Sequence, residues 1–142
     1  PGRTQMINCF RLDDRLRFVD LPGYGFAKVP VSVKEKWGRM VEGYLFQRQE
    51  LRLVVVLVDA RHDAQKMDMQ MLDSLAHYEV PYLVLATKAD KLKRNPLARQ
   101  LKTIRKGLGI AATEMIAFSA LDKRGFEETW AYIDQCCGFS DG

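Results

Sequence analysis

The sequence has little cysteine and no long apolar run. Its three cysteines are Cys9 and the adjacent pair Cys136 and Cys137, a spacing that provides no framework of disulfide bonds. No apolar run approaches the length of a membrane span, and the first residues contain no signal-peptide core. We therefore expect a protein of the reducing cytoplasm that has no membrane partner.

The composition is typical of a single globular domain. Hydrophobic residues make up 47% of the 142 residues, charged residues 28% and aromatic residues 10%, which is enough apolar material for a core. A net charge of +4 permits a polyanionic partner without requiring one, and we expect no DNA partner. The first residue is Pro1 rather than Met, so we expect the chain to start inside a longer protein, as one domain over 1–142 that is incomplete at its N-terminus.

Strand and helix patterns alternate along the chain. A near-continuous Val/Leu run at 51–58 predicts a parallel strand that is buried on both faces, and Asp13-Asp14 predicts the turn of an N-terminal hairpin. The expected strands lie at 4–12, 16–20, 51–58, 82–86 and 115–118, and the expected helices at 33–49, 67–75, 97–108 and 126–137. This order predicts a three-layer, doubly wound α/β sheet, mostly parallel with one antiparallel edge strand.

The stretch 17–27 places an aspartate at the end of a strand. Asp20 follows the run 16–19, and Pro22 and Gly23 then turn the backbone. In nucleotide hydrolases an Asp so placed holds Mg²⁺, and a Gly two or three residues later lets its N–H approach a terminal phosphate. The D-x-x-G pattern alone is weak, because an acidic turn after a buried strand gives the same residues.

Two further strand ends carry residues suited to reading a guanine base. The strand 82–86 runs into Thr87-Lys88-Ala89-Asp90, where the Asp90 carboxylate can accept from guanine N1–H and the N2 amino group, while the Lys88 stem lies along base and ribose. The strand 115–118 runs into Ser119-Ala120-Leu121, whose backbone N–H groups can meet guanine O6. A T-K-x-D string alone is more often a solvated turn. The three motifs in this order, each ending a strand, favour guanine nucleotide binding.

These strings resemble the EngB family of bacterial ribosome-biogenesis GTPases over essentially the whole chain. The resemblance is carried by Pro1-Gly2-Arg3-Thr4-Gln5, Asp20-Leu21-Pro22-Gly23-Tyr24-Gly25-Phe26-Ala27, Thr87-Lys88-Ala89-Asp90 and Phe118-Ser119-Ala120. It implies a P-loop GTPase fold, with GTP or GDP as ligand, Mg²⁺ as cofactor and K⁺ as a further candidate ion. It also implies a partner in the large ribosomal subunit or its precursor, and a role in that subunit's assembly and in septation.

The resemblance also implies a role for individual residues. Thr4 would ligate Mg²⁺ and sense the γ-phosphate, with Asp20 as a second, direct or water-mediated, magnesium ligand. Asp20 to Gly23 would form the second switch, and Phe118 to Ala120 would close over the base. The implied nucleotide-binding residues are Gly2, Arg3, Thr4, Gln5, Met6, Asp20, Leu21, Pro22, Gly23, Thr87, Lys88, Ala89, Asp90, Phe118, Ser119 and Ala120.

The sequence departs from the wider class in two ways. The phosphate loop G-x-x-x-x-G-K-[ST] is absent with its flanking strand and helix, so we expect a gap where that central strand lies in the related fold, and poor nucleotide binding and no activity from this segment alone. Tyr24 follows Gly23 where Ras-like proteins carry a glutamine, which predicts slow hydrolysis that the missing loop, a cation or the ribosome would accelerate. No catalytic residue is assigned.

The segment between Lys91 and Thr113 has no acidic residue. With apolar positions turned inward, its seven cations form a basic helix face, which is either a solvated surface or a contact for rRNA. The RNA-contact candidates are Lys93, Arg94, Arg99, Lys102 and Lys106. Trp37, Phe126 and Trp130 are expected in the core, and the segment 59–63 as a loop beside the second switch rather than a metal site.

Two functions are consistent with this sequence. The first is a nucleotide-switched assembly factor that hydrolyses GTP. The second is a non-catalytic RNA- or ribosome-binding module that keeps the fold without a phosphate loop. The sequence upstream of Pro1 discriminates between them, since only the first requires G-x-x-x-x-G-K-S there.

Overall fold

The computed structural model describes residues 8–12, 16–20 and 52–137. Close contacts group the chain into two compact units, Pro1–Gln49 and Glu50–Gly142, and each unit is described by itself. Several expectations lie outside the described residues. These are the helix at 33–49, Trp37 and the site residues Gly2, Arg3, Thr4, Gln5, Met6, Leu21, Pro22 and Gly23.

The N-terminal unit contains an antiparallel hairpin. Strand β1 (Asn8–Leu12) pairs with β2 (Leu16–Asp20), in a register that sets Asn8 opposite Asp20 and Leu12 opposite Leu16. The hairpin and the strand that ends at Asp20 are therefore confirmed, although the described part of the first strand begins at Asn8.

The second unit is built on a parallel sheet of three strands in the order β3-β4-β5. Its strands are β3 (Val54–Asp59), β4 (Tyr82–Thr87) and β5 (Met115–Ala117). Val54 lies opposite Tyr82 and Asp59 opposite Thr87, so β3 and β4 end at the same edge of the sheet. This arrangement, with a helix after each strand, confirms the α/β fold predicted from the alternating pattern.

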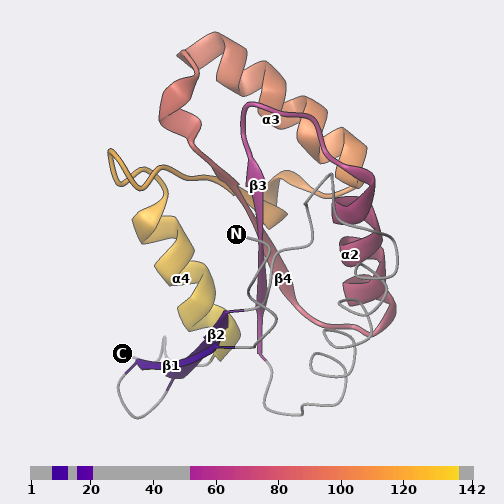
Figure 1. Cartoon of the computed structure of the whole chain (residues 1–142), viewed down its shortest axis with the longest axis vertical. Helices are drawn as coiled ribbons and strands as arrows, with labels where there is room; N and C mark the ends of the chain where they lie inside the picture. Colours follow the sequence, from indigo (N-terminus) through magenta and orange to yellow (C-terminus); the bar gives the residue numbers. More distant parts are fainter. Residues whose placement is uncertain (1–7, 13–15, 21–51, 138–142) are drawn as a thin grey trace. The chain divides into compact units, whose positions relative to one another are not determined.

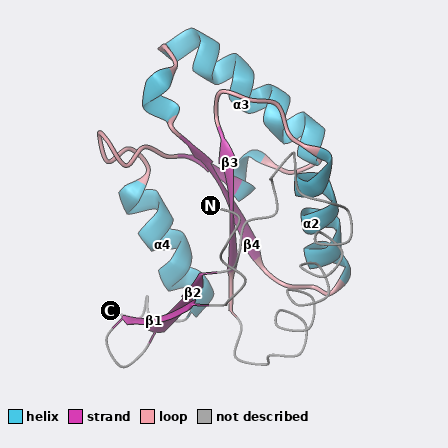
Figure 2. Cartoon of the chain, viewed as in Figure 1, coloured by secondary structure: helices cyan, strands magenta, loops and turns pink. Residues whose placement is uncertain are grey.

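Within residues 52–137, three helices flank this sheet. They are α2 (Lys66–His77), α3 (Arg94–Leu108) and α4 (Phe126–Cys137), and two single turns, η1 (Ala89–Lys91) and η2 (Ala112–Glu114), lie in the connections. Figure 1 shows α2 and α3 on one side of the β3–β4 sheet and α4 on the other, and Figure 2 shows the helix-strand alternation. No helix in the described ranges is long and apolar enough to cross a membrane.

The core of the second unit lies between β4 and these helices. Leu83, Val84 and Ala86 of β4 are fully buried, and so are Leu75 of α2 and Ile104 of α3. The four consecutive residues 83–86 of β4 are all buried. Because successive side chains of a strand point to opposite faces, both faces of β4 are covered.

The prediction that the run at 51–58 is buried on both faces is wrong for β3. Val56 and Val58 are buried, but Val55 and Leu57 are 36% and 62% exposed. Exposure that alternates with a period of two means that one face of the strand is covered and the other is not. An apolar run in the sequence does not by itself distinguish a strand that is covered on one face from a strand that is covered on both, because Val and Leu occur in both kinds of strand.

Helix α4 also differs from expectation. Ile133 is buried, as predicted, but Trp130 is 44% exposed, and the neighbouring Thr129 is buried instead. The spacing 126, 130, 133, 137 fits a helix face equally well when that face is rotated by one residue, and the structure centres the buried face on Thr129 and Ile133. The core assignment of Trp130 was therefore wrong, and Phe126 is half-buried.

Gly109 ends α3. Its φ of 69° is left-handed, and its N–H donates to the carbonyls of Arg105 and Lys106 at 2.8 and 3.3 Å. Ile110 N–H also donates to the Arg105 carbonyl at 3.1 Å, which together satisfies the last carbonyls of the helix. Gly107 lies inside the helix, where a Cβ would approach Ala64 Cβ to 3.3 Å.

Candidate functional site

The predicted base-reading segment begins where β4 ends. Thr87 closes the strand, its hydroxyl donates to the Val58 carbonyl at 3.1 Å, and its own carbonyl accepts from Ala60 N–H at 2.8 Å. Lys88 then adopts a left-handed backbone with φ 59°, which turns the chain into the single helical turn η1. This turn carries Asp90, so its position is fixed to the end of the sheet.

The carboxylate of Asp90 is held by Ser119. The Ser119 hydroxyl donates to Asp90 Oδ1 at 2.7 Å, and Lys91 Nζ lies 3.7 Å from Oδ2. Ser119 is fully buried, whereas the Asp90 side chain remains 13% exposed. The hydrogen bond from Ser119, more than any other contact, holds the pKa of Asp90 below its usual range. Asp90 is therefore an ionised acceptor with one oxygen committed to Ser119.

Backbone hydrogen bonds join the two loops that carry this pair. Phe118 N–H donates to the Ala86 carbonyl at 2.9 Å, and Ala89 N–H donates to the Phe118 carbonyl at 3.1 Å. The Phe118 ring stacks on the Phe126 ring of α4, with centroids 5.0 Å apart and planes 13° from parallel. The segments 87–90 and 118–120 are thus brought together as predicted, with the Phe118 ring against α4.

The backbone N–H groups of 119–121 are not equally accessible. Ser119 N–H donates to the Arg124 carbonyl at 3.0 Å, and Leu121 N–H donates to Ser119 Oγ at 3.2 Å. Among the residues that the structure describes, Ala120 N–H has no acceptor, and Ala120 is exposed. Of the three N–H groups proposed to meet guanine O6, the Ala120 group is therefore the one left to donate.

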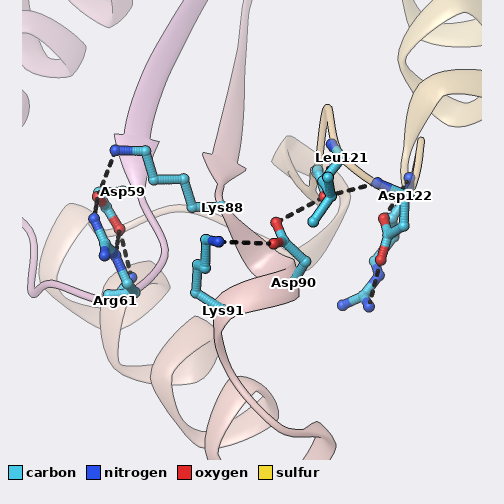
Figure 3. A network of polar contacts seen from close by, with 9 residues as sticks. Asp59, Arg61, Lys88, Asp90, Lys91, Leu121 and Asp122 are labelled. Carbon is cyan, nitrogen blue, oxygen red and sulfur yellow. Dashed lines mark hydrogen bonds and ion pairs between the residues drawn. The ribbon is translucent and has the colours of Figure 1, made fainter.

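A second polar cluster lies at the end of β3, where Asp59 accepts from Arg61 (Figure 3). Arg61 donates its Nε–H to Oδ1 at 3.0 Å and its Nη2–H to Oδ2 at 2.8 Å. These side-chain hydrogen bonds are the main reason that the pKa of Asp59 lies far below its usual range. Lys88 Nζ lies 3.6 Å from Asp59 Oδ2, which links this cluster to the base-reading segment.

Two of these relationships differ from the expectations. Ser119 was expected to act through its backbone, although its buried hydroxyl is what contacts Asp90, and Asp59 was expected only as part of a loop. One signal was available for Asp59, since it ends a strand of the parallel sheet as Thr87 does. Parallel strands bring such residues to one edge of the sheet.

The predicted magnesium ligands are placed only in part. Asp20 is the last residue of β2, and Thr4 lies outside the described residues. Within 52–137, no three His, Cys, Asp or Glu side chains are grouped closely enough to hold a metal ion.

The basic residues of α3 lie on its outer face. Leu97, Ile104 and Leu108 are buried, while Lys93, Arg94, Arg99, Lys102 and Lys106 are all exposed. Arg99, Lys102 and Lys106 lie on the side of α3 away from the buried residues, whereas Lys93 and Arg94 lie at the helix N-terminus; these five exposed cations are together called the basic face of α3.

Comparison with known proteins extends this picture. A family model described as "50S ribosome-binding GTPase" matches residues 1–88. "Probable GTP-binding protein EngB" of Streptococcus pneumoniae (strain Hungary19A-6) is 47% identical over 134 residues, which cover 94% of this chain and 69% of that protein. The chain belongs to the EngB family of P-loop GTPases. The EngB relative from Geobacter metallireducens is 52% identical over 134 residues, which cover 94% of this chain and 66% of that protein.

Solved structures agree with this family at the level of the fold. A crystal structure titled as a probable GTP-binding protein EngB superposes with a TM-score of 0.80 at 19% identity, covering 96% of this chain and 82% of that one. Era, solved in complex with MgGDPNP and nucleotides of 16S ribosomal RNA, gives a TM-score of 0.65 at 16% identity, over 92% of this chain and 43% of that one. The fold around β3, β4 and β5 is thus that of P-loop GTPases.

Proposed function

We propose that this protein binds guanine nucleotides and, as an intact protein, hydrolyses GTP slowly. One observation carries the nucleotide assignment. The Asp90 carboxylate is fixed by the buried Ser119 hydroxyl, and the exposed Ala120 N–H follows Ser119 directly. The site therefore offers a charged acceptor beside a free donor. A guanine presents the complementary set, with donors at N1 and N2 and an acceptor at O6.

This arrangement discriminates against adenine. Adenine carries an amino group where guanine has O6, and it lacks the N1–H and N2 donors that the Asp90 carboxylate would accept. A site built to hydrogen-bond a substrate rejects the analogue that lacks those groups, because its own polar groups stay unpaired. We therefore expect strong preference for GTP and GDP over ATP.

The chemistry at the phosphates falls to residues outside the second unit. Thr4 and Asp20 offer the oxygen donors that Mg²⁺ prefers, and Mg²⁺ would neutralise charge between the β- and γ-phosphates. Gly23 would present its N–H to the terminal phosphate without a Cβ in the way. Tyr24 cannot orient water as a glutamine does, so intrinsic hydrolysis is slow, and K⁺ or a ribosomal partner accelerates it.

The experiment that tests the nucleotide assignment is Asp90→Asn in the full-length protein. The change replaces a carboxylate oxygen with an NH₂ group, which cannot accept from the guanine N1–H and N2 donors. GTP affinity therefore falls at least about tenfold, a loss of about 1.4 kcal/mol. Xanthine has a carbonyl in place of the amino group and accepts from that amide, so affinity for XTP rises. Fluorescence competition of GTP, ATP and XTP at equal magnesium measures both changes. Equal losses for all nucleotides, or tight ATP binding by wild type, would contradict the assignment.

A role at the ribosome is the second part of the proposal. The protein acts in the cytoplasm in assembly of the large ribosomal subunit and, through it, in normal septation. Support comes from the family description "50S ribosome-binding GTPase" and from the basic face of α3, which suits an rRNA backbone. The competing function is a ribosome-binding module without nucleotide turnover. Single-turnover hydrolysis of GTP by the full-length protein, with and without ribosomal particles, separates the two.

A further inference from the structure

The carboxylate of Asp59 lies between two cations that come from different strand ends. Arg61 follows it in the same loop, and Lys88 extends to it from the end of β4 (Figure 3). The two strands pair with Asp59 opposite Thr87, which sets the backbone of Lys88 one residue beyond that pair. The contact between Asp59 and Lys88 is therefore built on the register of the sheet.

Arg61 fixes the Asp59 side chain. Besides the two guanidinium contacts, Arg61 N–H donates to Oδ1 at 2.9 Å, so one residue supplies three hydrogen bonds to one carboxylate. The Asp59 side chain is 23% exposed and that of Arg61 40%. A bidentate pair of this kind holds both planes in one orientation. Asp59 is thus a fixed negative charge beside the path of Lys88.

Lys88 needs such a charge if its side chain is to stay in one place. Its backbone is left-handed and its side chain is 56% exposed, so packing restrains the stem little. Ordering a free lysine side chain costs conformational entropy. Its ion-pair partner among the described residues is Asp59, with Nζ 3.6 Å from Oδ2.

We propose that Asp59 is a positioning residue of the nucleotide site, which holds the Lys88 ammonium so that the lysine stem forms a preordered wall for the guanine base and ribose. Asp59 does not touch the nucleotide itself. This inference rests on the proposed guanine nucleotide binding and names a residue that assists it. A preordered wall lowers the entropy that binding would otherwise lose.

The test is a double-mutant cycle in the full-length protein, read by titration of a fluorescent GDP analogue. The proteins are wild type, Asp59→Asn, Lys88→Met and the double variant. Because the pair is partly exposed, Asp59→Asn weakens GDP binding by about three- to tenfold. In the Lys88→Met background, which keeps the stem but has no ammonium, Asp59→Asn has no further effect. Asp63→Asn is the matched control, because Asp63 lies in the same loop but accepts from Gln100 at 3.1 Å, and its GDP affinity equals that of wild type.

Each outcome decides one question. If Asp59→Asn weakens binding equally in both backgrounds, Asp59 acts through the loop and not through Lys88, and the inference is overturned while guanine nucleotide binding stands. Wild-type affinity in Asp59→Asn overturns it as well. If wild type itself binds no GDP, the proposed function fails, and the inference fails with it. If Asp59→Asn weakens GDP binding in the wild-type background but not in the Lys88→Met background, the inference is supported.

Discussion

The Ser119 hydroxyl donates to Asp90 Oδ1 at 2.7 Å and, with its own oxygen, accepts from Leu121 N–H at 3.2 Å and from Asp122 N–H at 3.3 Å. One fully buried oxygen thus contacts both the carboxylate that is predicted to read the base and the loop that carries the Ala120 N–H. Within the described ranges, no other side chain donates to Asp90 Oδ1.

Ser119→Ala should therefore impair both stability and guanine binding. The change leaves two N–H groups without their acceptor, which costs about 1–3 kcal/mol of the free energy of unfolding. It also frees the Asp90 carboxylate to rotate, so GDP affinity falls by about tenfold at temperatures where the variant is folded. Urea unfolding and GDP titration measure the two effects. Ser74→Ala, a change of the same kind in α2, should stay within about 0.5 kcal/mol of wild type, and a Ser119→Ala protein that matches it would contradict the assigned role.

Gly125 begins the turn into α4, and its replacement should be costly. Its φ is 82°, and an added Cβ would clash with the Ala117 carbonyl oxygen, which is backbone and cannot move aside freely. Gly125→Ala should lower the free energy of unfolding by more than about 2 kcal/mol, since the left-handed penalty of about 1–2 kcal/mol adds to the clash.

Gly109→Ala separates the two contributions in the same denaturation experiment. Gly109 has a φ of 69°, but a Cβ there would meet nothing within 4 Å. This variant should lose only the left-handed penalty, about 1–2 kcal/mol. Equal losses from the two variants would show that the close approach to Ala117 adds nothing.

The raised pKa of Tyr82 predicts that the free energy of unfolding decreases at alkaline pH. Burial, together with its hydrogen bond to Glu114, raises the pKa of Tyr82 from 10.0 to about 12. Between pH 10 and 12 the unfolded chain releases this proton before the folded protein does, so the stability that is present below pH 10 is lost as the pH rises to about 12.

Tyr82→Phe removes that part of the pH dependence. Urea unfolding at pH 9, 10, 11 and 12 should show a shallower decline for the variant, although its stability at pH 9 is about 1 kcal/mol lower through the lost hydrogen bond. Tyr132, whose pKa is also raised by burial, is present in both proteins, so their difference reports Tyr82 together with its charge coupling to Tyr132. Parallel declines would refute the assignment.

The basic face of α3 should carry the affinity for ribosomal particles. Replacing Arg99, Lys102 and Lys106 with glutamine removes three exposed cations, so binding weakens and the slope of log K against log salt decreases by about 2–3 units. Nucleotide affinity should not change. Glutamine at Arg52, Lys66 and Lys123 makes the same change of net charge elsewhere on the exposed surface and is the matched control. If both triple variants weaken particle binding equally, the affinity depends on net charge and not on the basic face of α3.

The elements with a clear hydrophobic pattern were predicted from the sequence. The prediction was wrong where two faces of one helix fit the apolar spacing equally well. The pattern of β4 and the apolar spacing of α3 were sufficient, because Leu83, Val84 and Ile104 can only face the core. In α4, Trp130 and Thr129 both fit a helix face, and packing against the sheet, which no local pattern records, decided between them.

The site shows the same division. Strand-end positions identified Asp90 and Ser119 as neighbours, because parallel strands align their carboxyl ends. The Ser119 hydroxyl contact and the Asp59–Lys88 pair depend on side-chain direction and on the left-handed backbone at Lys88. Such details follow from the register of β3, β4 and β5 in space rather than from spacing along the chain.

That register also determines when the site can appear during folding. Val54 pairs with Tyr82 and Val84 with Met115, so every pairing of the parallel sheet joins segments separated by a whole helical crossover. Such contacts must close a long loop before they gain any favourable energy, which slows folding. The Asp90–Ser119 contact spans the second crossover and cannot precede it. Nucleotide binding therefore reports on a chain whose last strand has already docked, and a newly made chain should acquire its guanine specificity late in folding.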